Sequence, residues 1–174
     1  TTASNNTAVG YFALVANTTG AENVAMGALT LDANTTGNGN TGLGYKAISS
    51  DTKGSRNTAI GHESLANQNF TSATNAYNVA VGFQAGNQVT TGLYNTLIGG
   101  LAGDALTDAD YNVAIGVSAL GVDTLGSRSV AIGYSALEAQ NFTSATDSYN
   151  TAVGHKAGAA VTTGRQNTLI GGLA

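Results

Sequence analysis

A five-residue pattern that recurs at a fixed interval constrains this chain more than any other feature. The pattern first occurs as Asn6-Thr7-Ala8-Val9-Gly10, and its ten copies start at 6, 23, 40, 57, 78, 95, 112, 129, 150 and 167. The interval between consecutive starts is 17, except after the starts at 57 and 129, where it is 21, so the starts at 6, 78 and 150 mark a superrepeat of 72. Such a strict period predicts one solenoid domain over residues 1–174, in which each unit forms one coil stacked on the next.

Within each unit, apolar residues alternate in the way that a short β-strand requires. With the first residue counted as offset zero, offset one is Thr or Val, offset two is usually Ala, and offset three is Val, Met, Leu or Ile. The alternation predicts a strand with offsets one and three on one face and offset two on the other. Because the small face is also apolar, we expect a neighbouring chain or a second layer to cover it. The residues at offsets seven and eight predict a second inward-facing segment.

Two offsets carry one residue type in almost every unit, and we expect them to form columns along the stack. Stacked coils lie about 4.8 Å apart, so equivalent Asn amides can hydrogen-bond from coil to coil. Glycine at offset four indicates a corner with positive φ or a very close backbone approach. The asparagine column comprises Asn6, Asn23, Asn40, Asn57, Asn78, Asn95, Asn112, Asn150 and Asn167, with Ser129 in the remaining unit. The glycine column comprises Gly10, Gly27, Gly44, Gly61, Gly82, Gly99, Gly116, Gly133, Gly154 and Gly171.

The composition agrees with a thin, regular core and argues against several classes of function. The chain has 24 glycines, no proline, cysteine or tryptophan, and only 9% charged residues. Without cysteine it forms no disulfides and no thiolate metal sites. A net charge of -4, with six scattered Lys and Arg, argues against nucleic-acid partners. No apolar run is long enough to cross a membrane and no leader pattern occurs, so the sequence predicts neither membrane insertion nor a signal peptide.

The stretch Gln-Asn-Phe-Thr-Ser-Ala-Thr occurs twice without change, at 68–74 and 140–146. Both copies lie in the long units, so they mark four extra residues at the same phase of the repeat. The stack fixes the corners and must push this excess outward, which predicts a surface ledge at every fourth coil, about 19 Å apart. We expect Phe70, Thr71, Phe142 and Thr143 to project from the ledges as candidate receptor contacts.

The repeat also has a family resemblance. Asn112-Val113-Ala114-Ile115-Gly116 and Ser129-Val130-Ala131-Ile132-Gly133, each followed by a small residue at offset seven, resemble the head repeats of trimeric autotransporter adhesins. The order and spacing of the repeated motifs are also similar to those of repetitive phage tail-fibre and marine viral structural proteins. The resemblance covers essentially the whole chain and implies an all-β fold, a left-handed parallel β-roll, with three chains packed side by side into a fibre. The 17-residue unit and the 21-residue ledges depart from the adhesin heads.

Two groups of polar residues are candidate ion sites. Asp104, Asp108 and Asp110 lie in one turn, where carboxylate oxygens suit calcium, but their spacing matches no known calcium loop and a solvated acidic turn is favoured. His62 and His155 share offset five but lie five coils apart, roughly 24 Å, so one chain cannot bring both to one ion. No paired carboxylates or Ser-His-Asp set can be assembled, so we expect no enzyme activity.

Columns of aromatic and hydroxyl side chains have two interpretations each. Aromatic rings at offset five and just before offset zero support the coil register, or stack on sugars. Threonines at offset twelve suggest an ice-binding array, but Lys53, Asp108 and Leu125 break the adjacent column, so hydrogen bonding within the turn is favoured. The aromatic residues are Tyr11, Tyr45, Phe83 and Tyr134 in one column and Tyr77, Tyr94, Tyr111 and Tyr149 in the other. The threonines are Thr18, Thr35, Thr52, Thr90, Thr107, Thr124 and Thr162.

Together these features predict an extracellular structural fibre segment on a virion or cell surface, without cofactor or metal. Its expected function is reach, rigidity and multivalent contact with a host. The expected partners are copies of the same chain, three by resemblance, and a cell-surface glycan or protein receptor. Ice binding through the threonine column is the alternative. The chain starts and stops in mid-unit without polar caps, so we expect it to be part of a longer array.

Overall fold

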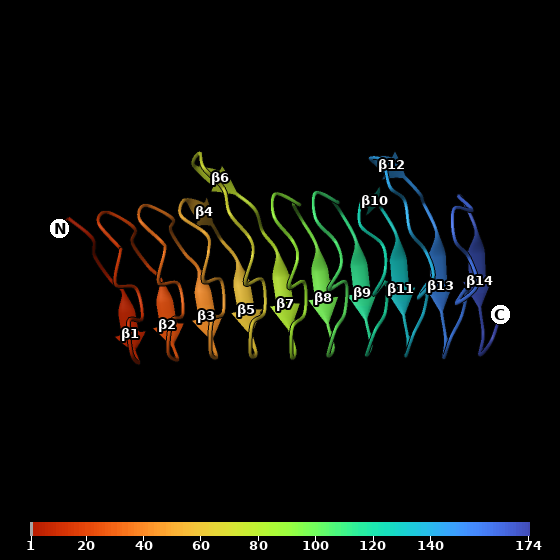
Figure 1. Ribbon diagram of the computed structural model, residues 1–174, viewed down its shortest axis with the longest axis horizontal. Coiled ribbons are helices and arrows are strands. Elements are labelled where there is room, and N and C mark those ends of the chain that lie inside the picture. Colours follow the sequence, from red (N-terminus) through yellow and green to blue (C-terminus); the bar gives the residue numbers. More distant parts are fainter. Residues whose placement is uncertain (1) are drawn as a thin grey trace.

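The protein is a rod built from stacked coils of backbone (Figure 1). The computed structural model describes residues 2–174, and in this range every regular element is a β-strand. One parallel sheet of ten short strands runs the length of the rod. Its strands are β1 (Thr7–Val9), β2 (Val24–Met26), β3 (Thr41–Leu43), β5 (Thr58–Ile60), β7 (Val79–Val81), β8 (Thr96–Ile98), β9 (Val113–Ile115), β11 (Val130–Ile132), β13 (Thr151–Val153) and β14 (Thr168–Ile170). The predicted parallel β-solenoid is confirmed.

Equivalent residues of successive coils lie side by side in the sheet. Thr7 pairs with Val24 and Val9 with Met26, and this register holds at every step, including the steps across the two long coils. The backbone N–H of Thr7 donates to the carbonyl of Asn23 at 2.8 Å, and equivalent bonds follow up the stack. The coil starts predicted from the sequence therefore each lie directly before a strand.

Two small sheets mark the long coils. β4 (Gly54–Ser55) pairs with β6 (Thr74–Asn75), and β10 (Gly126–Ser127) pairs with β12 (Thr146–Asp147), both in parallel. Figure 1 shows β6 and β12 raised above the other coils on the same side of the rod. The four extra residues thus project outward, as the stacking argument predicts.

The interior lies on the face of the sheet that carries the small residues. The residues at offset two in β2, β5, β7, β8, β9, β11 and β13 are fully buried, whereas those at offset three, such as Met26 and Leu43, are 42% and 43% exposed. Of the two expected covers for the small face, a neighbouring chain or a second layer, the structure has the second layer, which is the opposite wall of the same coils. The coil is so thin that only Ala or Gly usually fits between the sheet and the opposite wall, and the bulkier side chains turn outward.

Offsets seven, eight and eleven complete the core, as expected for the second inward-facing segment. Leu usually occupies offset eight and Ala offset two, but β8 has Leu97 at offset two. Around it, offset eight is Gly86 in one coil and Gly103 in the next, where an added Cβ would lie 2.6 and 2.7 Å from the Leu97 methyl groups. Leu169 and Gly158 repeat this exchange. The filled volume of the core is thus kept, while the bulky side chain comes from the strand at offset two instead of the opposite wall at offset eight.

The glycine column turns the chain directly after each strand. Its members have φ between +126° and +141°, a region in which other residues are strained. Their backbones also approach closely, because a Cβ on Gly99 would lie 2.6 Å from the carbonyl oxygen of Gly116. Both reasons predicted for the invariant glycine hold.

Three other positions of the coil adopt left-handed backbone without requiring glycine. They lie just before offset zero and at offsets six and eight; Tyr94, Phe12 and Leu31 are examples, with φ of 58°, 55° and 51°. Left-handed φ at a non-glycine residue costs of order 1 kcal/mol, which the packing of each coil on its neighbours must offset. The left-handed backbone at these positions was not predicted from the repeat, although Gly39 and Gly86 occupy two of them.

The asparagine column forms a buried ladder, although its bonds differ from the prediction. Most of its amides bond backbone groups rather than one another: Oδ1 accepts from the first residue of the next coil, and Nδ2 donates to the carbonyl at offset fourteen of the same unit. Asn23 Oδ1 accepts from the backbone N–H of Asn40 at 2.9 Å, and its Nδ2 donates to the carbonyl of Gly37 at 2.8 Å. Direct amide-to-amide bonds occur between Asn57 and Asn40 and between Asn167 and Asn150. Most rungs thus satisfy two backbone groups that would otherwise be buried without partners.

Candidate functional site

The tips of the two ledges are the most prominent exposed loops of the rod. Thr71 and Thr143 are exposed, as are the Ser and Ala that follow each of them. Phe70 and Phe142 do not project, since each is only 6% exposed. Their rings turn back over Gly54 and Gly126, where an added Cβ would lie 2.8 Å from the ring. The prediction that these two rings project from the ledges is therefore wrong, because covering the glycines removes them from water.

A buried polar network anchors the first ledge. Gln68 is fully buried, and its Nε2 donates to Asp51 Oδ2 at 2.6 Å. Its Oε1 accepts from Asn78 Nδ2 at 2.9 Å, which ties the network to the asparagine column. The other oxygen of Asp51 accepts the backbone N–H groups of Gly54 at 2.9 Å and Phe70 at 3.1 Å. Several donors thus compensate the buried carboxylate where no cation pairs with it in the described residues.

The second ledge repeats this network one superrepeat later. Gln140 Nε2 donates to Asp123 Oδ2 at 2.6 Å, and its Oε1 accepts from Asn150 Nδ2 at 2.7 Å. Gln140 Nε2 also reaches the hydroxyl of Ser129, the one rung of the column that is not asparagine. The recurrence of Gln and Phe in both stretches is therefore explained by anchoring. The exposed Thr-Ser-Ala tips need no such anchoring, and they stay the candidate contact residues.

One aromatic column is a continuous stack closed by arginines. Tyr77, Tyr94 and Tyr111 stack with ring centroids 5.7 and 4.9 Å apart. The guanidinium group of Arg56 lies 5.5 Å from the Tyr77 ring, and that of Arg128 lies 4.7 Å from the Tyr111 ring. The faces of these three rings are occupied by one another and by the arginines. This favours the interpretation in which the column supports the register of the coils over the one in which it stacks on sugars.

The column at offset five is also stacked. His62 lies between Tyr45 and Phe83, with centroids 5.1 and 5.4 Å apart, and His155 stacks on Tyr134 at 5.4 Å. Both histidines are thus corner residues within aromatic stacks, as favoured from the sequence. No group of three or more metal-ligating side chains that could hold an ion occurs among residues 2–174.

The acidic turn is engaged with its own backbone and neighbours. Asp108 accepts from the hydroxyl of Thr91 at 2.6 Å, and Asp110 accepts from the N–H of Leu93 at 2.7 Å. Burial raises the pKa of Asp104 above its usual value. Burial also raises the pKa of Asp110, and the bond from Leu93 partly offsets this rise. The three carboxylates are not gathered into a metal site in the described part of the chain.

The outer face of the long sheet is an apolar stripe, which we define as the residues at offset three. Val9, Met26, Leu43, Ile98 and Ile170 are 37% to 71% exposed, and the other members are partly exposed. Thr and Val at offset one lie beside them on the same face. The stripe runs along the whole rod, since every strand contributes one member. A continuous exposed apolar surface is a candidate interaction site.

The threonine hydroxyls at offset twelve bond within the stack. Thr18 Oγ1 donates to the carbonyl of Thr35 at 3.0 Å, and Thr35 Oγ1 to that of Thr52 at 2.9 Å. The column is interrupted by Asn69 and Asn141 in the long coils. This arrangement favours the structural interpretation over an ice-binding array.

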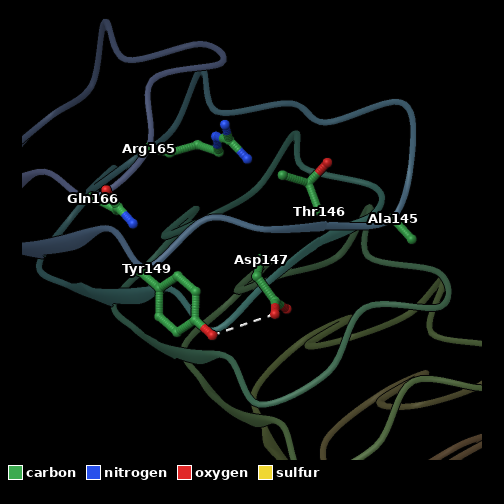
Figure 2. A pocket seen from close by; sticks show the side chains of 6 residues that line it. All are labelled: Ala145, Thr146, Asp147, Tyr149, Arg165 and Gln166. Atoms are coloured by element: carbon green, nitrogen blue, oxygen red, sulfur yellow. Dashed lines mark hydrogen bonds between the residues drawn. The ribbon is translucent and has the colours of Figure 1, made fainter.

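A pocket of about 330 Å³ opens between the second ledge and the next coil (Figure 2). Ala145, Thr146, Asp147 and Tyr149 line it from the ledge, and Arg165 and Gln166 line it from the following coil. Tyr149 donates its hydroxyl to Asp147 at 3.3 Å, and the carboxylate of Asp147 also pairs with Arg128 at 2.9 Å. The pocket was not recognised in the sequence, because its residues come from two coils and no repeated motif marks them.

No helix in residues 2–174 is long and apolar enough to span a membrane. Comparison of the chain with protein-family models, with curated proteins and with solved structures found no match in any of the three.

Proposed function

We propose that this chain is a segment of a structural fibre on the surface of a virion or cell, in which copies of the rod pack through the apolar stripe. The unbroken stripe carries the proposal. Exposed aliphatic side chains at every coil are unfavourable in water, and their burial stabilises a complex by about 25 cal/mol per Å².

A second copy of the chain is the partner that fits this surface best. The stripe has the same spacing as the coils, so two rods aligned in register bring every aliphatic residue against an equivalent one. A hetero-partner would need the same period. Three rods around an axis enclose the stripe in a shared core, in agreement with the resemblance to adhesin heads and tail fibres.

The proposed role is mechanical and multivalent rather than catalytic. Rungs of buried asparagine and a glycine column hold the coils at a fixed spacing, which makes the rod stiff. The ledges recur at every fourth coil and present identical Thr-Ser-Ala tips. Several weak contacts made at once by a rigid array gain avidity without any new contact, which suits adhesion to a host glycan or protein.

Light scattering coupled to size-exclusion chromatography tests the proposal. We expect a mass three times that of the 17.2 kDa chain. Ile98→Glu places a charge in the centre of the stripe and should return the mass to one chain, because a buried unpaired carboxylate costs several kcal/mol. Thr163→Glu, on an exposed turn, is the control and should keep the oligomer. A monomeric wild-type protein would overturn the proposal.

A further inference from the structure

The pocket at the second ledge has one feature that the first ledge lacks, an aromatic ring on which no other ring stacks, although the guanidinium group of Arg128 lies 5.9 Å from its centroid. In the first ledge, Tyr77 is covered by Tyr94 of the next coil, at a centroid distance of 5.7 Å. In the second ledge, the residue equivalent to Tyr94 is Gln166, and no ring covers Tyr149 on that side in the described residues. Tyr149 is 52% exposed and lines the pocket. An uncovered tyrosine face is a surface on which the C–H groups of a sugar ring stack.

The same pocket holds a cation that is not neutralised. Arg165 replaces Leu93 of the first ledge, and in residues 2–174 it forms no ion pair. Figure 2 shows its side chain extending from the neighbouring coil toward the ledge. The one carboxylate of the pocket, Asp147, is already paired with Arg128. The charged side chains that line the pocket, together with the Arg128 that pairs with Asp147, therefore sum to one positive charge, and a guanidinium group binds carboxylates in a bidentate geometry.

The remaining lining groups are polar and small. Thr146 offers a hydroxyl, Gln166 an amide, and Asp147 an acceptor, which together match the hydroxyl groups of a sugar. A volume of about 330 Å³ suits one or two sugar units rather than a protein segment.

We propose that this pocket binds an acidic sugar, a pyranose that carries a carboxylate. The carboxylate pairs with Arg165, the apolar face of the ring stacks on Tyr149, and the hydroxyl groups bond Asp147, Gln166 and Thr146. This inference deepens the adhesive part of the proposed function and rests on it, since it names the class of ligand that the fibre contacts. The open pocket supports only weak binding at each site, and an oligomer multiplies it.

Saturation-transfer and chemical-shift NMR with three methyl glycosides tests the assignment on the full chain. The probes are methyl N-acetylneuraminide and methyl glucuronide, which carry carboxylates, and methyl glucoside, which does not. We expect at least one acidic glycoside to bind saturably with a dissociation constant on the order of 1 mM, and the neutral one at least about tenfold more weakly. The two acidic probes distinguish sialic acids from uronic acids.

The first ledge supplies the matched variant. The double variant Arg165→Leu, Gln166→Tyr gives the second ledge the residues that the first ledge has at the equivalent positions, Leu93 and Tyr94. Because the first ledge folds with this pair, we expect the second ledge to accommodate it. This variant should lose acidic-sugar binding by at least about tenfold while its thermal unfolding and mass stay unchanged, and Arg165→Lys alone should retain part of the binding.

No binding of either acidic glycoside, equal binding of the neutral one, or full binding by the double variant would overturn the assignment. The mass in solution separates this result from the proposed fibre. An oligomer that binds no acidic sugar contradicts the pocket assignment alone, and a monomer that binds it contradicts the fibre alone.

Discussion

At the scale of single residues, the glycine column shows most directly how stacking dictates residue type. Gly99 has φ of +135°, and a Cβ there would lie 2.6 Å from the backbone of Gly116. Its neighbour Gly100 has no positive φ, and the nearest atom to an added Cβ is 4.0 Å away. Two adjacent glycines thus differ in whether the fold needs them.

This contrast gives a prediction. Gly99→Ala should destabilise the rod by about 3 kcal/mol or more, because it combines a strained φ with a backbone clash that no side-chain movement relieves. Gly100→Ala should change stability by less than about 0.5 kcal/mol. Urea unfolding followed by circular dichroism measures both. Equal losses in the two variants would show that the corners do not lie directly over one another.

Asp32 is a residue that the stack tolerates at a cost. Its Oδ1 is buried without a hydrogen-bond partner in the described residues, and burial raises its pKa above the usual value despite the nearby Lys46. Because the folded state binds the proton more tightly than the unfolded state, the ionised form is destabilising. The resulting loss of stability develops as the pH rises from the unfolded pKa through the raised folded pKa.

Asp32→Asn removes this ionisation and should therefore raise the urea midpoint near pH 7. The gain should shrink toward zero near pH 3, where Asp32 is protonated in both states. Glu22→Gln, at an exposed carboxylate, controls for the change in net charge. A gain of equal size at both pH values would contradict the assigned role of burial.

At the scale of the coil, the exchange of bulk between the two walls determines which sequences stack. Leu97 fills the space above Gly86 and Gly103, whereas the next coil has Ala114 in the strand and Leu120 on the opposite wall. Leu97→Ala should cost about 2–5 kcal/mol, because it leaves a cavity next to two glycines.

Adding Gly103→Leu to Leu97→Ala should restore part of that loss. The double variant copies the following coil at offsets two and eight, and the backbone at offset eight already holds leucine at φ near +54° in Leu120. At offset eleven it keeps Leu106, whose methyl lies 2.9 Å from a Cβ on Gly103 and must turn aside, so we expect the rescue to be partial. Stability measurements on the two single variants and the double variant give the coupling energy, which we expect to exceed about 1 kcal/mol in favour of the pair. Simple additivity would mean that the two walls pack independently.

Within the coil, some features could be predicted from the sequence and others could not. Strand positions, corners and ledges followed from repetition alone, because a stack forces equal residues to equal places. The inward face of the strand did not, since Ala25 and Met26 are both apolar and the thickness of the coil, not hydropathy, decides between them. Phe70 was placed outside because nothing in its own stretch shows that Gly54 leaves space for its ring. Asp51 and Asp123, which also recur at the superrepeat interval, were the signal that could have revealed the anchors.

At the scale of the whole molecule, the rod joins a thin, closely packed interior to an apolar outer stripe. The interior holds the coils in register, and the stripe leaves a surface that a single chain cannot cover. This combination explains why a repeat rich in small residues forms an extended rod rather than a globular domain. The ledges add polar contacts at a period set by the stack, and the pocket between Asp147 and Arg165 makes the second ledge different from the first.

The distance between equivalent residues of distant coils tests the stacking most directly. Thr19 and Thr163 are exposed, share offset thirteen, and lie eight coils apart, with two full superrepeats of sequence between them. The chain has no cysteine, so Thr19→Cys with Thr163→Cys carries two spin labels cleanly. Pulsed electron spin resonance, with labelled chains diluted in unlabelled ones, should give one narrow distribution at roughly 38 Å, eight coil spacings of about 4.8 Å. A broad distribution, or a narrow one centred far from this value, would contradict in-register stacking of the coils.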